Sequence, residues 1–339
     1  MNLYITSDKV GSESGGGLVT HHESEALKEI GPTKVLDQRG PTSPDVFQAD
    51  HELSFDIENE KPILAHFYSG TFSKTIGKLK SLGCKITYTA AAHNIELSKK
   101  EHRRLGLEFN YPHLVDPQLW RNYVRGYLDA DVVICPSEHS TDCMRSYGCK
   151  RIEIIPHGCE IPENVAAFPD KFVVGYLGAV GPDKGLIYLL QAWKRLNYKD
   201  ALLVFAGSQS ISNFMVDLIN KFGGGSICLS GWVNNVSDFY NSLSCLVQAS
   251  VSEGFGLEIL EAMAHGRIVI ASEGAGASFL LPKEYIVKRA DVDDLAERID
   301  SIKKNGVQSS QATLLRDIAK QYTWDKIRAS YVRLWRRLL

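Results

Sequence analysis

Short apolar runs alternate with helical stretches along most of the chain, and this alternation limits the possible folds more than any other feature. In the first half, the apolar runs predict strands at Asn2–Ile5, Ile63–His66, Lys85–Thr89, Val132–Pro136 and Arg151–Pro156. The pattern then restarts, with strands predicted at Phe172–Leu177, Leu202–Ala206, Ser226–Ser230, Cys245–Gln248 and Ile268–Ser272. Such alternation is typical of parallel sheets covered by helices. Two successive doubly wound α/β domains explain it better than one large sheet.

Amphipathic stretches separate these strands, and one break divides the pattern. The predicted helices are Thr20–Ile30, Phe72–Leu82, Gly185–Leu196, Ser212–Phe222, Val236–Ser242 and Leu257–His265. The break is Cys159–Lys171, where two prolines and several polar residues predict a linker. We therefore expect an N-terminal domain over residues 1–160 and a C-terminal domain over residues 171–322.

The last segment, residues 323–339, is predicted to be an amphipathic helix. Its apolar residues recur at spacings of three and four and form one stripe, while four arginines lie elsewhere. We expect the stripe to dock on the protein's own surface, with the helix returning to the N-terminal domain. Chain ends rich in Arg and Trp also bind lipid interfaces, so peripheral contact with the inner membrane surface is the alternative.

Composition excludes several classes of protein. The chain has 339 residues, 44% of them hydrophobic and 23% charged, which is typical of a soluble globular protein. A net charge of -2 gives no general attraction to nucleic acid, so no nucleic-acid partner is expected. Seven cysteines without CxxC spacing indicate reduced thiols. With no signal peptide and no long apolar run visible, we expect a cytoplasmic protein; its oligomeric state does not follow from the sequence.

The segment Ser252–Gly266 carries the strongest functional signal. It places two carboxylates, Glu253 and Glu261, eight positions apart, with a glycine-rich turn and a helix start between them. Backbone N–H groups in such a turn, together with the positive end of the helix dipole, suit a phosphate. The two glutamates are acceptors placed for hydroxyl groups. Phosphate with several hydroxyls describes a nucleotide sugar.

Each glutamate also has a structural interpretation. Glu261 lies at the border of the apolar stripe of its helix, whereas Glu258 falls further round. A partly buried carboxylate needs a hydrogen-bond partner, which would be a ribose diol or a structural group such as a backbone amide or an Arg. Glu253 follows a predicted strand, at the sheet edge where open α/β folds bind ligands. In the structural interpretation, Glu253 is an ordinary acidic residue before a helix, where the helix dipole favours a negative charge.

The segment Ser252–Glu261, with Ala262–Gly266 behind it, resembles the E-x7-E signature of the glycosyl transferases group 1 family. Those proteins are retaining, nucleotide-sugar-dependent glycosyltransferases with the GT-B fold, in which two Rossmann-like domains face each other across a cleft. Four further segments match the family. Gly178–Gly185 is similar to its phosphate-contacting turn, and Ile155–Gly158 is similar to its I-P-N-G. Ala130–Ser137 is similar to its A-D-x-V-I-x-x-S strand, and Val269–Ser272 also matches. The resemblance is good over about 130–290 and weaker before that.

The resemblance implies roles for the residues of the signature. Glu253 would bind hydroxyls of the donor sugar, and Glu261 would bind the ribose. Backbone amides around Phe255, Gly256 and Leu257 would meet the pyrophosphate or the sugar. Neither glutamate would need to act as a covalent nucleophile, because the family is usually described as reacting on one face of the sugar with help from the donor phosphate.

The resemblance also assigns a cation to the phosphates. Lys184 would bind them and stabilise the leaving diphosphate as its charge develops. The structural alternative is a lysine at the start of a surface helix. The family usually has an Arg five positions earlier, where this chain has Ala179. Another basic residue could replace that Arg, backbone groups could do so, or activity could be reduced.

The N-terminal half offers two further candidates. His93 follows a predicted strand and resembles the family histidine that approaches the donor sugar, with a structural histidine as the alternative. Gly16 and Gly17 belong to a glycine run predicted to precede a helix at Leu18–Ile30. They could let the backbone approach the donor phosphate or the acceptor, or form a flexible turn. His66 ends a strand and is interpreted as structural.

The sequence therefore predicts a metal-independent retaining glycosyltransferase that uses a nucleotide sugar as substrate and has no cofactor. The D-x-D pattern at Asp129–Asp131 leads into a strand, so we expect no metal there. The acceptor would be a glycan, a lipid or a small molecule. Three alternatives stay open: a GT-B epimerase, a phosphorylase, and a non-catalytic homologue that binds nucleotide sugars.

Overall fold

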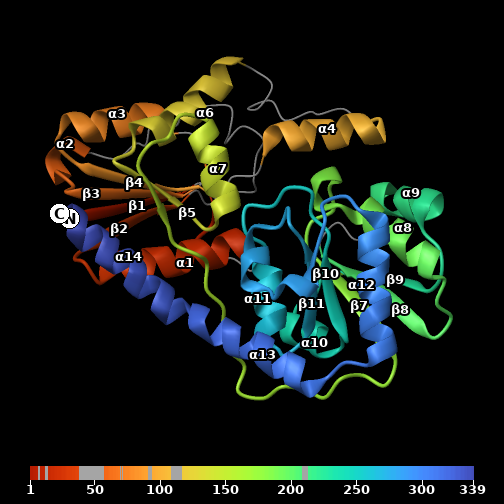
Figure 1. Cartoon of the computed structure of the whole chain (residues 1–339). Helices are drawn as coiled ribbons and strands as arrows, with labels where there is room; N and C mark the ends of the chain where they lie inside the picture. Colours follow the sequence, from red (N-terminus) through yellow and green to blue (C-terminus); the bar gives the residue numbers. More distant parts are fainter. Residues whose placement is uncertain are drawn as a thin grey trace. The chain divides into compact units, whose positions relative to one another are not determined.

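A computed structural model describes residues 1–6, 8–11, 14–37, 57–68, 70, 72–90, 94–107, 117–207 and 213–339. Its internal contacts divide the chain into two compact units. Unit 1 comprises Met1–Ala92, Glu108–His157 and Trp324–Leu339, and unit 2 comprises His93–Leu107 and Gly158–Thr323. Each unit is built around one six-stranded parallel sheet flanked by helices, so the predicted fold of two Rossmann-like domains is confirmed (Figure 1).

The sheet of unit 1 has the strand order β2-β1-β3-β4-β5-β6. Its strands are β1 (Asn2–Thr6), β2 (Thr33–Asp37), β3 (Leu64–Tyr68), β4 (Lys85–Thr89), β5 (Val132–Cys135) and β6 (Ile152–Ile154). All neighbouring strands are parallel. Strands β1 and β3 are wholly buried, because helices cover both faces. The order reverses between these two strands, which makes their carboxyl ends the switch point of the sheet.

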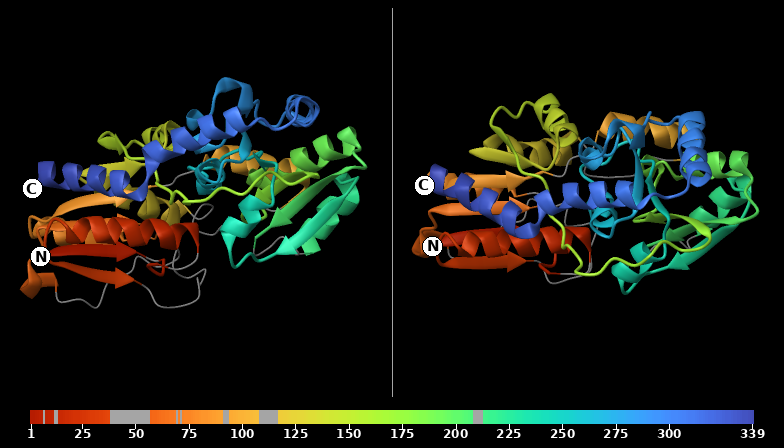
Figure 2. Two further views of the ribbon diagram at one scale, coloured as in Figure 1. Left: turned by 90° about the horizontal axis from the view of Figure 1, so that it is seen from below. Right: turned by 60° about the horizontal axis from the view of Figure 1, so that its bottom comes forward.

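Four of the described helices of unit 1 pack in two pairs. They are α1 (Gly15–Lys28), α2 (Ile57–Glu60), α3 (Ser73–Ser81), α6 (Pro117–Asp129), α7 (Glu138–Ser146) and α14 (Trp324–Leu338). α1 packs against α14, and α3 packs against α6. Both views show α14 running beside α1, with the two chain ends at the same end of the unit (Figure 1 and Figure 2).

The glycine run lies inside α1, so the prediction that it precedes the helix was wrong. The side chain of Ser14 occupies the N-cap and accepts a hydrogen bond from the Gly17 amide at 3.0 Å. Serine is among the best N-cap residues, and capping offsets the low helix propensity of the glycines that follow. Gly16 and Gly17 therefore form the first turn of the helix that follows β1.

The C-terminal helix docks on unit 1, as its apolar stripe predicted. Its buried residues are Trp324, Ile327, Tyr331, Val332, Leu334 and Trp335. Trp324 stacks on His22 of α1 with ring centroids 4.1 Å apart. The Nε1 of Trp335 donates to Thr87 Oγ1 of β4 at 3.0 Å. The stripe is thus used for packing within the molecule.

A buried carboxylate on α1 connects this helix to the sheet. Glu23 is 1% exposed, and its Oε1 accepts hydrogen bonds from the hydroxyls of Thr89 and Tyr331, both at 2.7 Å. Its Oε2 accepts from the Tyr4 hydroxyl at 2.7 Å and lies 3.1 Å from His66 Nε2. These contacts join α1, α14 and strands β1, β3 and β4. His66 is therefore structural, as predicted.

The same contacts determine the charge of Glu23. Burial alone would raise the pKa of this carboxyl, because an ion is poorly solvated inside a protein. The neighbouring His66 ring and the hydrogen bonds from His66 and the tyrosine hydroxyls outweigh burial, and the pKa lies below its usual value. Glu23 is ionised near neutral pH, so each donor around it faces a full negative charge.

The sheet of unit 2 has the order β12-β11-β10-β7-β8-β9. Its strands are β7 (Phe172–Leu177), β8 (Ala201–Ala206), β9 (Ile227–Gly231), β10 (Cys245–Gln248), β11 (Ile268–Ser272) and β12 (Ile286–Val287). The chain builds outward from β7 to β9 and then crosses to β10 on the other side. This is the doubly wound dinucleotide-type order, and its switch point lies between β7 and β10.

The helices of unit 2 cover both faces of this sheet. They are α4 (Ile95–Leu105), η2 (Pro182–Lys184), α8 (Leu186–Leu196), α9 (Asn213–Phe222), α10 (Val236–Asn241), α11 (Leu257–Ala264), η3 (Gly276–Leu280), η4 (Lys283–Tyr285), α12 (Val292–Asn305), α13 (Ser309–Ala319) and η5 (Lys320–Tyr322). α8 packs against α9 and α12, and α11 packs against α13. The core between them holds Trp193, Tyr176 and Phe205.

Helix α4 belongs to unit 2, although the sequence placed it within the N-terminal domain. The Tyr188 hydroxyl of α8 donates to Glu101 of α4 at 2.9 Å, and the Arg104 guanidinium lies 4.6 Å from the centre of the Tyr188 ring. At the start of the helix, the Asn94 amide donates to Ser252 Oγ at 2.6 Å. These long-range partners decide the assignment, and no local pattern reveals them.

Six of the seven cysteines are buried in this fold. All seven are free thiols, and only Cys228 is exposed. Burial raises the pKa of Cys84 to about 12 and that of Cys143 to about 11, so these thiols stay protonated at neutral pH. The expectation of reduced thiols is confirmed.

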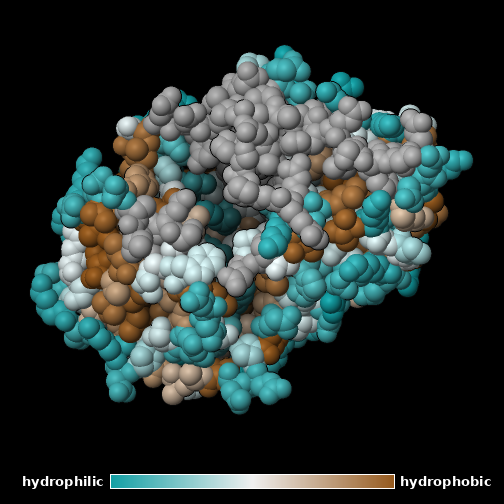
Figure 3. Space-filling model, turned by 180° about the vertical axis from the view of Figure 1, so that it is seen from behind, coloured by the Kyte–Doolittle hydropathy of each residue, from teal (hydrophilic) through white to brown (hydrophobic). Residues whose placement is uncertain are grey.

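The coloured part of the surface in Figure 3 shows no continuous apolar belt. Where residues are coloured there, hydrophobic ones form separate patches among hydrophilic ones. Large exposed hydrophobic residues such as Ile63, Trp232 and Phe279 belong to different segments of the chain. None of the described helices combines the length and apolarity needed to cross a bilayer.

Candidate active site

Two loops meet at the switch point of unit 2, one after β7 and one after β10. The amide of Val251 donates to the carbonyl of Asp183 at 2.7 Å, which joins the loops directly. Gly185 has φ +68°, and a Cβ on it would lie 1.9 Å from the carbonyl oxygen of Ala249. Only glycine fits such an approach of two backbones. The junction places Lys184, the residue before this glycine, beside the loop that carries Glu253.

Glu253 is fixed by its backbone and paired through its side chain. Its amide donates to the Gly274 carbonyl at 2.9 Å, and its carbonyl accepts from the Gly276 amide at 3.0 Å. Its carboxylate forms an ion pair with Lys184 Nζ, and the two side chains are 18% and 23% exposed. The structure therefore brings together the predicted acid and the predicted cation, and leaves both partly open to a ligand.

Lys184 keeps its charge in this environment. Burial by itself would lower the pKa of the ammonium group. The negative charge of Glu253, with smaller contributions from Tyr176 and Glu258, outweighs burial and raises the pKa above its ordinary value. The site thus holds a permanent cation at the switch point.

The first turn of α11 faces the same region. Gly256 occupies the N-cap with φ +93°, and no side chain among the described residues caps this helix end. The carbonyl of the preceding Phe255 accepts from the Ala277 amide at 2.7 Å, which holds the turn in place. Leu257 is the first helical residue. The positive end of the helix dipole therefore lies where the sequence predicted backbone amides for a phosphate.

Glu258 is a residue of this site that the sequence reasoning missed. A Cβ placed on Gly256 would lie 3.6 Å from Glu253 Cγ and 3.7 Å from Glu258 Oε1, so both acids border this glycine. The Nε2 of Gln248, the last residue of β10, donates to Glu258 Oε1. Burial raises the pKa of Glu258 to about 8, with repulsion by Glu253 adding to the shift and attraction to Lys184 opposing it. Its position in the first turn of α11 is the sequence signal that could have identified it.

Glu261 has a structural partner of a kind that was not expected. The buried Tyr240 hydroxyl of α10 donates to Glu261 Oε2 at 2.6 Å, in place of a backbone amide or an Arg. Burial raises the pKa of Glu261, while the hydrogen bond from Tyr240 opposes this shift. A role as the acceptor of ribose hydroxyls stays a prediction.

Ala179 leaves the loop after β7 without the second cation of the family pattern. The carbonyl of Ala179 accepts a hydrogen bond from the Tyr176 hydroxyl at 2.6 Å, so the backbone is fixed there. Among the largest contributions to the pKa of Glu258, the one from a cation comes from Lys184. A phosphate at this switch point would depend on Lys184 and on backbone groups.

The candidates from the N-terminal half stay predictions. His93 lies outside the described residues. Gly16 and Gly17 lie in unit 1, at the start of α1, and a Cβ on Gly16 would lie 3.2 Å from Asp8 Oδ2. Their predicted contact with donor phosphate or acceptor therefore stays a prediction.

The D-x-D pattern is used for structure. Asp131 Oδ2 accepts a hydrogen bond from the Ile86 amide of β4 at 2.8 Å. Asp129 pairs with Arg125 on the same helix at 3.3 Å. Within the described residues, no group of three or more His, Cys, Asp or Glu side chains is placed to hold a metal ion.

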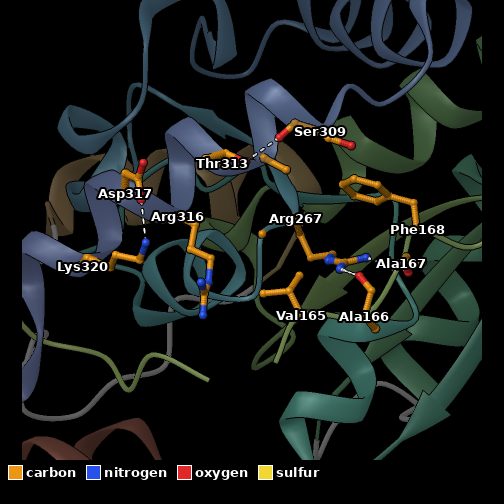
Figure 4. Close-up of a pocket in the computed structure, with 12 residues that line it drawn as sticks. Val165, Ala166, Ala167, Phe168, Arg267, Ser309, Thr313, Arg316, Asp317 and Lys320 are labelled. Atoms are coloured by element: carbon orange, nitrogen blue, oxygen red, sulfur yellow. Dashed lines mark hydrogen bonds and ion pairs between the residues drawn. The ribbon is translucent and has the colours of Figure 1, made fainter. Parts of the chain in front are cut away.

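A separate cavity of about 510 Å³ lies beside α13 and the linker before β7 (Figure 4). Arg267 is wholly buried there, donates to the carbonyls of His265 and Leu243 at 3.0 and 3.1 Å, and stacks over Phe168. Arg316 donates to the Ala264 carbonyl at 3.0 Å. Because Arg267 directly precedes β11, this cavity borders the amino ends of the strands. These arginines hold backbone carbonyls in place, at the edge of the sheet away from the switch point.

Comparison with known proteins finds a family model that matches the second half of the chain. Residues 160–321 match the family model described as glycosyl transferases group 1. An uncharacterized glycosyltransferase of Methanocaldococcus jannaschii is 28% identical over 176 residues, which is 49% of this chain and 45% of that protein. The match therefore spans a little under half the length of that relative.

Solved structures resemble the chain over nearly its whole length. Sucrose-phosphate synthase from Thermosynechococcus elongatus matches with a TM-score of 0.78 at 18% identity, covering 99% of this chain and 98% of that one. Anabaena HepE, in a complex with UDP-glucose, matches with a TM-score of 0.70 at 17% identity, covering 99% and 100%. At these identities the likeness establishes the fold, which is GT-B.

Proposed function

We propose that this chain, whose residues 160–321 match the glycosyl transferases group 1 family, transfers a sugar from a nucleotide-sugar donor to an acceptor hydroxyl. The proposed reaction retains the anomeric configuration, needs no metal ion and takes place in the cytoplasm. One observation carries the proposal. A permanent cation, a carboxylate and an uncapped helix start meet at the switch point of a dinucleotide-type sheet, where such sheets bind ligands.

Unit 2 would hold the donor through Lys184 and Glu253, which form an ion pair with each other. A donor diphosphate would take over part of the lysine's interaction and would also meet the amides at the start of α11. Glu253, released in part from Lys184, could accept hydrogen bonds from sugar hydroxyls. Glu261, supported by Tyr240, would accept from the ribose.

The chemistry would then depend on stabilising the leaving group. Negative charge grows on the diphosphate as the bond to the sugar breaks, and a fixed cation with fixed amides stabilises that charge. The donor phosphate would assist removal of the acceptor proton on the same face of the sugar. Unit 1 would bind the acceptor, which is a glycan, a lipid or a small molecule.

Two comparisons support a nucleotide-sugar donor. The relative from M. jannaschii is described as a glycosyltransferase, and HepE, which shares the fold, was solved with UDP-glucose.

A thermal-shift screen of UDP-, GDP- and ADP-sugars, with and without EDTA, tests donor binding. A ligand present at a hundred times its Kd stabilises the folded state by about 2.7 kcal/mol. We expect one donor class to raise the unfolding temperature equally in both conditions. NMR of the product formed with an acceptor would then show the retained anomer. The absence of a shift with every donor would contradict the proposal.

Ala179 favours one second candidate, a protein that binds nucleotide sugars without turning them over. Loss of the family's second phosphate cation would reduce stabilisation of the leaving group more than binding of the ground state. Release of free nucleoside diphosphate that depends on an acceptor supports the transferase. Donor binding with neither hydrolysis nor transfer across a broad acceptor panel supports the binding protein.

A further inference from the structure

Charge at the switch point is unbalanced if every acid there is ionised. Lys184 supplies one positive charge, while Glu253 and Glu258 both border Gly256. Ala179 stands where the family pattern has an arginine. Two ionised carboxylates facing one cation would repel a diphosphate, so a site of this kind needs a way to remove one negative charge.

Gln248 offers a structural reason for a proton on Glu258. This glutamine is 1% exposed, and its Nε2 donates to Glu258 Oε1. Its own Oε1 is buried and has no hydrogen-bond partner in the part of the chain that the structure describes. An ionised carboxylate cannot donate to that oxygen, but a protonated carboxyl can. A carboxylic acid and a primary amide can form two matched hydrogen bonds, one in each direction.

The groups around Glu258 also favour the neutral form. The other acids that act on it are Glu253 from the loop after β10 and Glu261 from its own helix, and Lys184 is the opposing cation. Tyr176 of β7 and Tyr240 of α10 also interact with Glu258 and stay neutral, because burial raises the pKa of both hydroxyls. Burial and repulsion outweigh the single lysine, which raises the pKa of Glu258 above its ordinary range.

We propose that Glu258 carries a proton that it shares with Gln248, and that it is a positioning residue that keeps Lys184 available to the donor diphosphate. The identity of the ligand rests on the proposed function. Loss of the proton would draw Lys184 toward a second carboxylate and place another negative charge beside the phosphates. Donor binding should therefore weaken as the pH rises through the pKa of Glu258.

The proton can be observed directly without any ligand. Infrared difference spectra between the wild type and Glu258→Gln at pH 6.5 should contain the band of a protonated carboxyl group. That band should disappear as the pH is raised to 9.5. A difference spectrum at pH 6.5 that contains only carboxylate bands would overturn the proposal.

Calorimetric titration with UDP, GDP and ADP between pH 7 and pH 9.5 tests the consequence. We expect wild-type affinity to fall by about tenfold, the effect of a shift of one pKa unit. Glu258→Gln and Glu258→Leu, which are neutral at every pH, should show no such fall, while Glu284→Gln, at an exposed acid, should behave as the wild type. An equal pH dependence in the wild type and in both neutral variants contradicts the proposal. If no diphosphate binds, the proposed function is wrong. The infrared band then tests the protonation of Glu258 independently of any ligand.

Discussion

Replacing Glu23 by glutamine should destabilise unit 1, because this buried carboxylate accepts four hydrogen bonds. Two reach Oε1 and two reach Oε2, from Thr89, Tyr331, Tyr4 and His66. Glutamine has the same shape but offers one acceptor oxygen and one NH₂ group, which would face two donors. Two bonds to a charged acceptor are lost, at about 1.5–3 kcal/mol each. We expect the free energy of unfolding to fall by about 3 kcal/mol or more at neutral pH.

The effect should depend on pH with a defined sign. The pKa of Glu23 is lower in the folded protein than in the unfolded chain, so its ionised form favours folding. This contribution is complete above the unfolded pKa of about 4.3 and is lost as the pH falls through the lower folded pKa. The difference between wild type and Glu23→Gln should therefore be full at neutral pH and shrink in acid.

Urea unfolding of the whole chain, followed by circular dichroism and tryptophan fluorescence, measures this difference. Tyr331→Phe removes one donor to the same carboxylate and should cost less than Glu23→Gln. The matched control is Glu25→Gln on the same helix, which removes a solvent-exposed pair with Lys28 worth at most about 1 kcal/mol. If Glu23→Gln were no more destabilising than Glu25→Gln, the reasoning about the buried network would be refuted.

Three further predictions concern unit 2. Glu253→Gln should weaken the binding of a nucleotide sugar, measured by calorimetry, more than the binding of the matching nucleoside diphosphate. Equal losses of affinity would show that Glu253 does not contact the sugar. Glu261→Ala should lose hydrogen bonds of about 1.5–3 kcal/mol each and reduce donor affinity at least about tenfold, and unchanged affinity would exclude it from the site. Gly185→Ala should lower the unfolding temperature clearly, because its Cβ would lie 1.9 Å from the Ala249 carbonyl oxygen at φ +68°. An unchanged unfolding temperature would mean that the two loops do not meet as described.

The sequence predicted the central strands of both sheets, because buried parallel strands are continuous apolar runs. It missed β2 and β12, which lie at the edges of their sheets. β2 (Thr33–Asp37) is only partly buried, and β12 (Ile286–Val287) has two residues, too few to show a pattern. The placement of α4 in unit 2 also escaped prediction, because it depends on contacts with α8 from a distant part of the chain.

The candidate site was predictable where one short segment carries it. Glu253 and the start of α11 follow from local sequence, and Lys184 follows from the loop after β7. Glu258 was missed because its contact with Gln248 depends on how α11 packs against β10. In the sequence, helical periodicity was the only feature that distinguished Glu258 from Glu261. The protonation and the contacts of each acid depend on burial and on neighbouring charges, which the sequence pattern does not show.

Binding of the donor diphosphate to Lys184 is the central claim, and calorimetry tests it most directly. UDP, GDP and ADP would be titrated into the wild type, Lys184→Gln and Lys283→Gln, in which an exposed lysine of the same unit is replaced. The account predicts that one diphosphate binds the wild type and Lys283→Gln alike, and Lys184→Gln at least about tenfold more weakly, the value of one charge-assisted hydrogen bond. Equal affinity in all three proteins would contradict it.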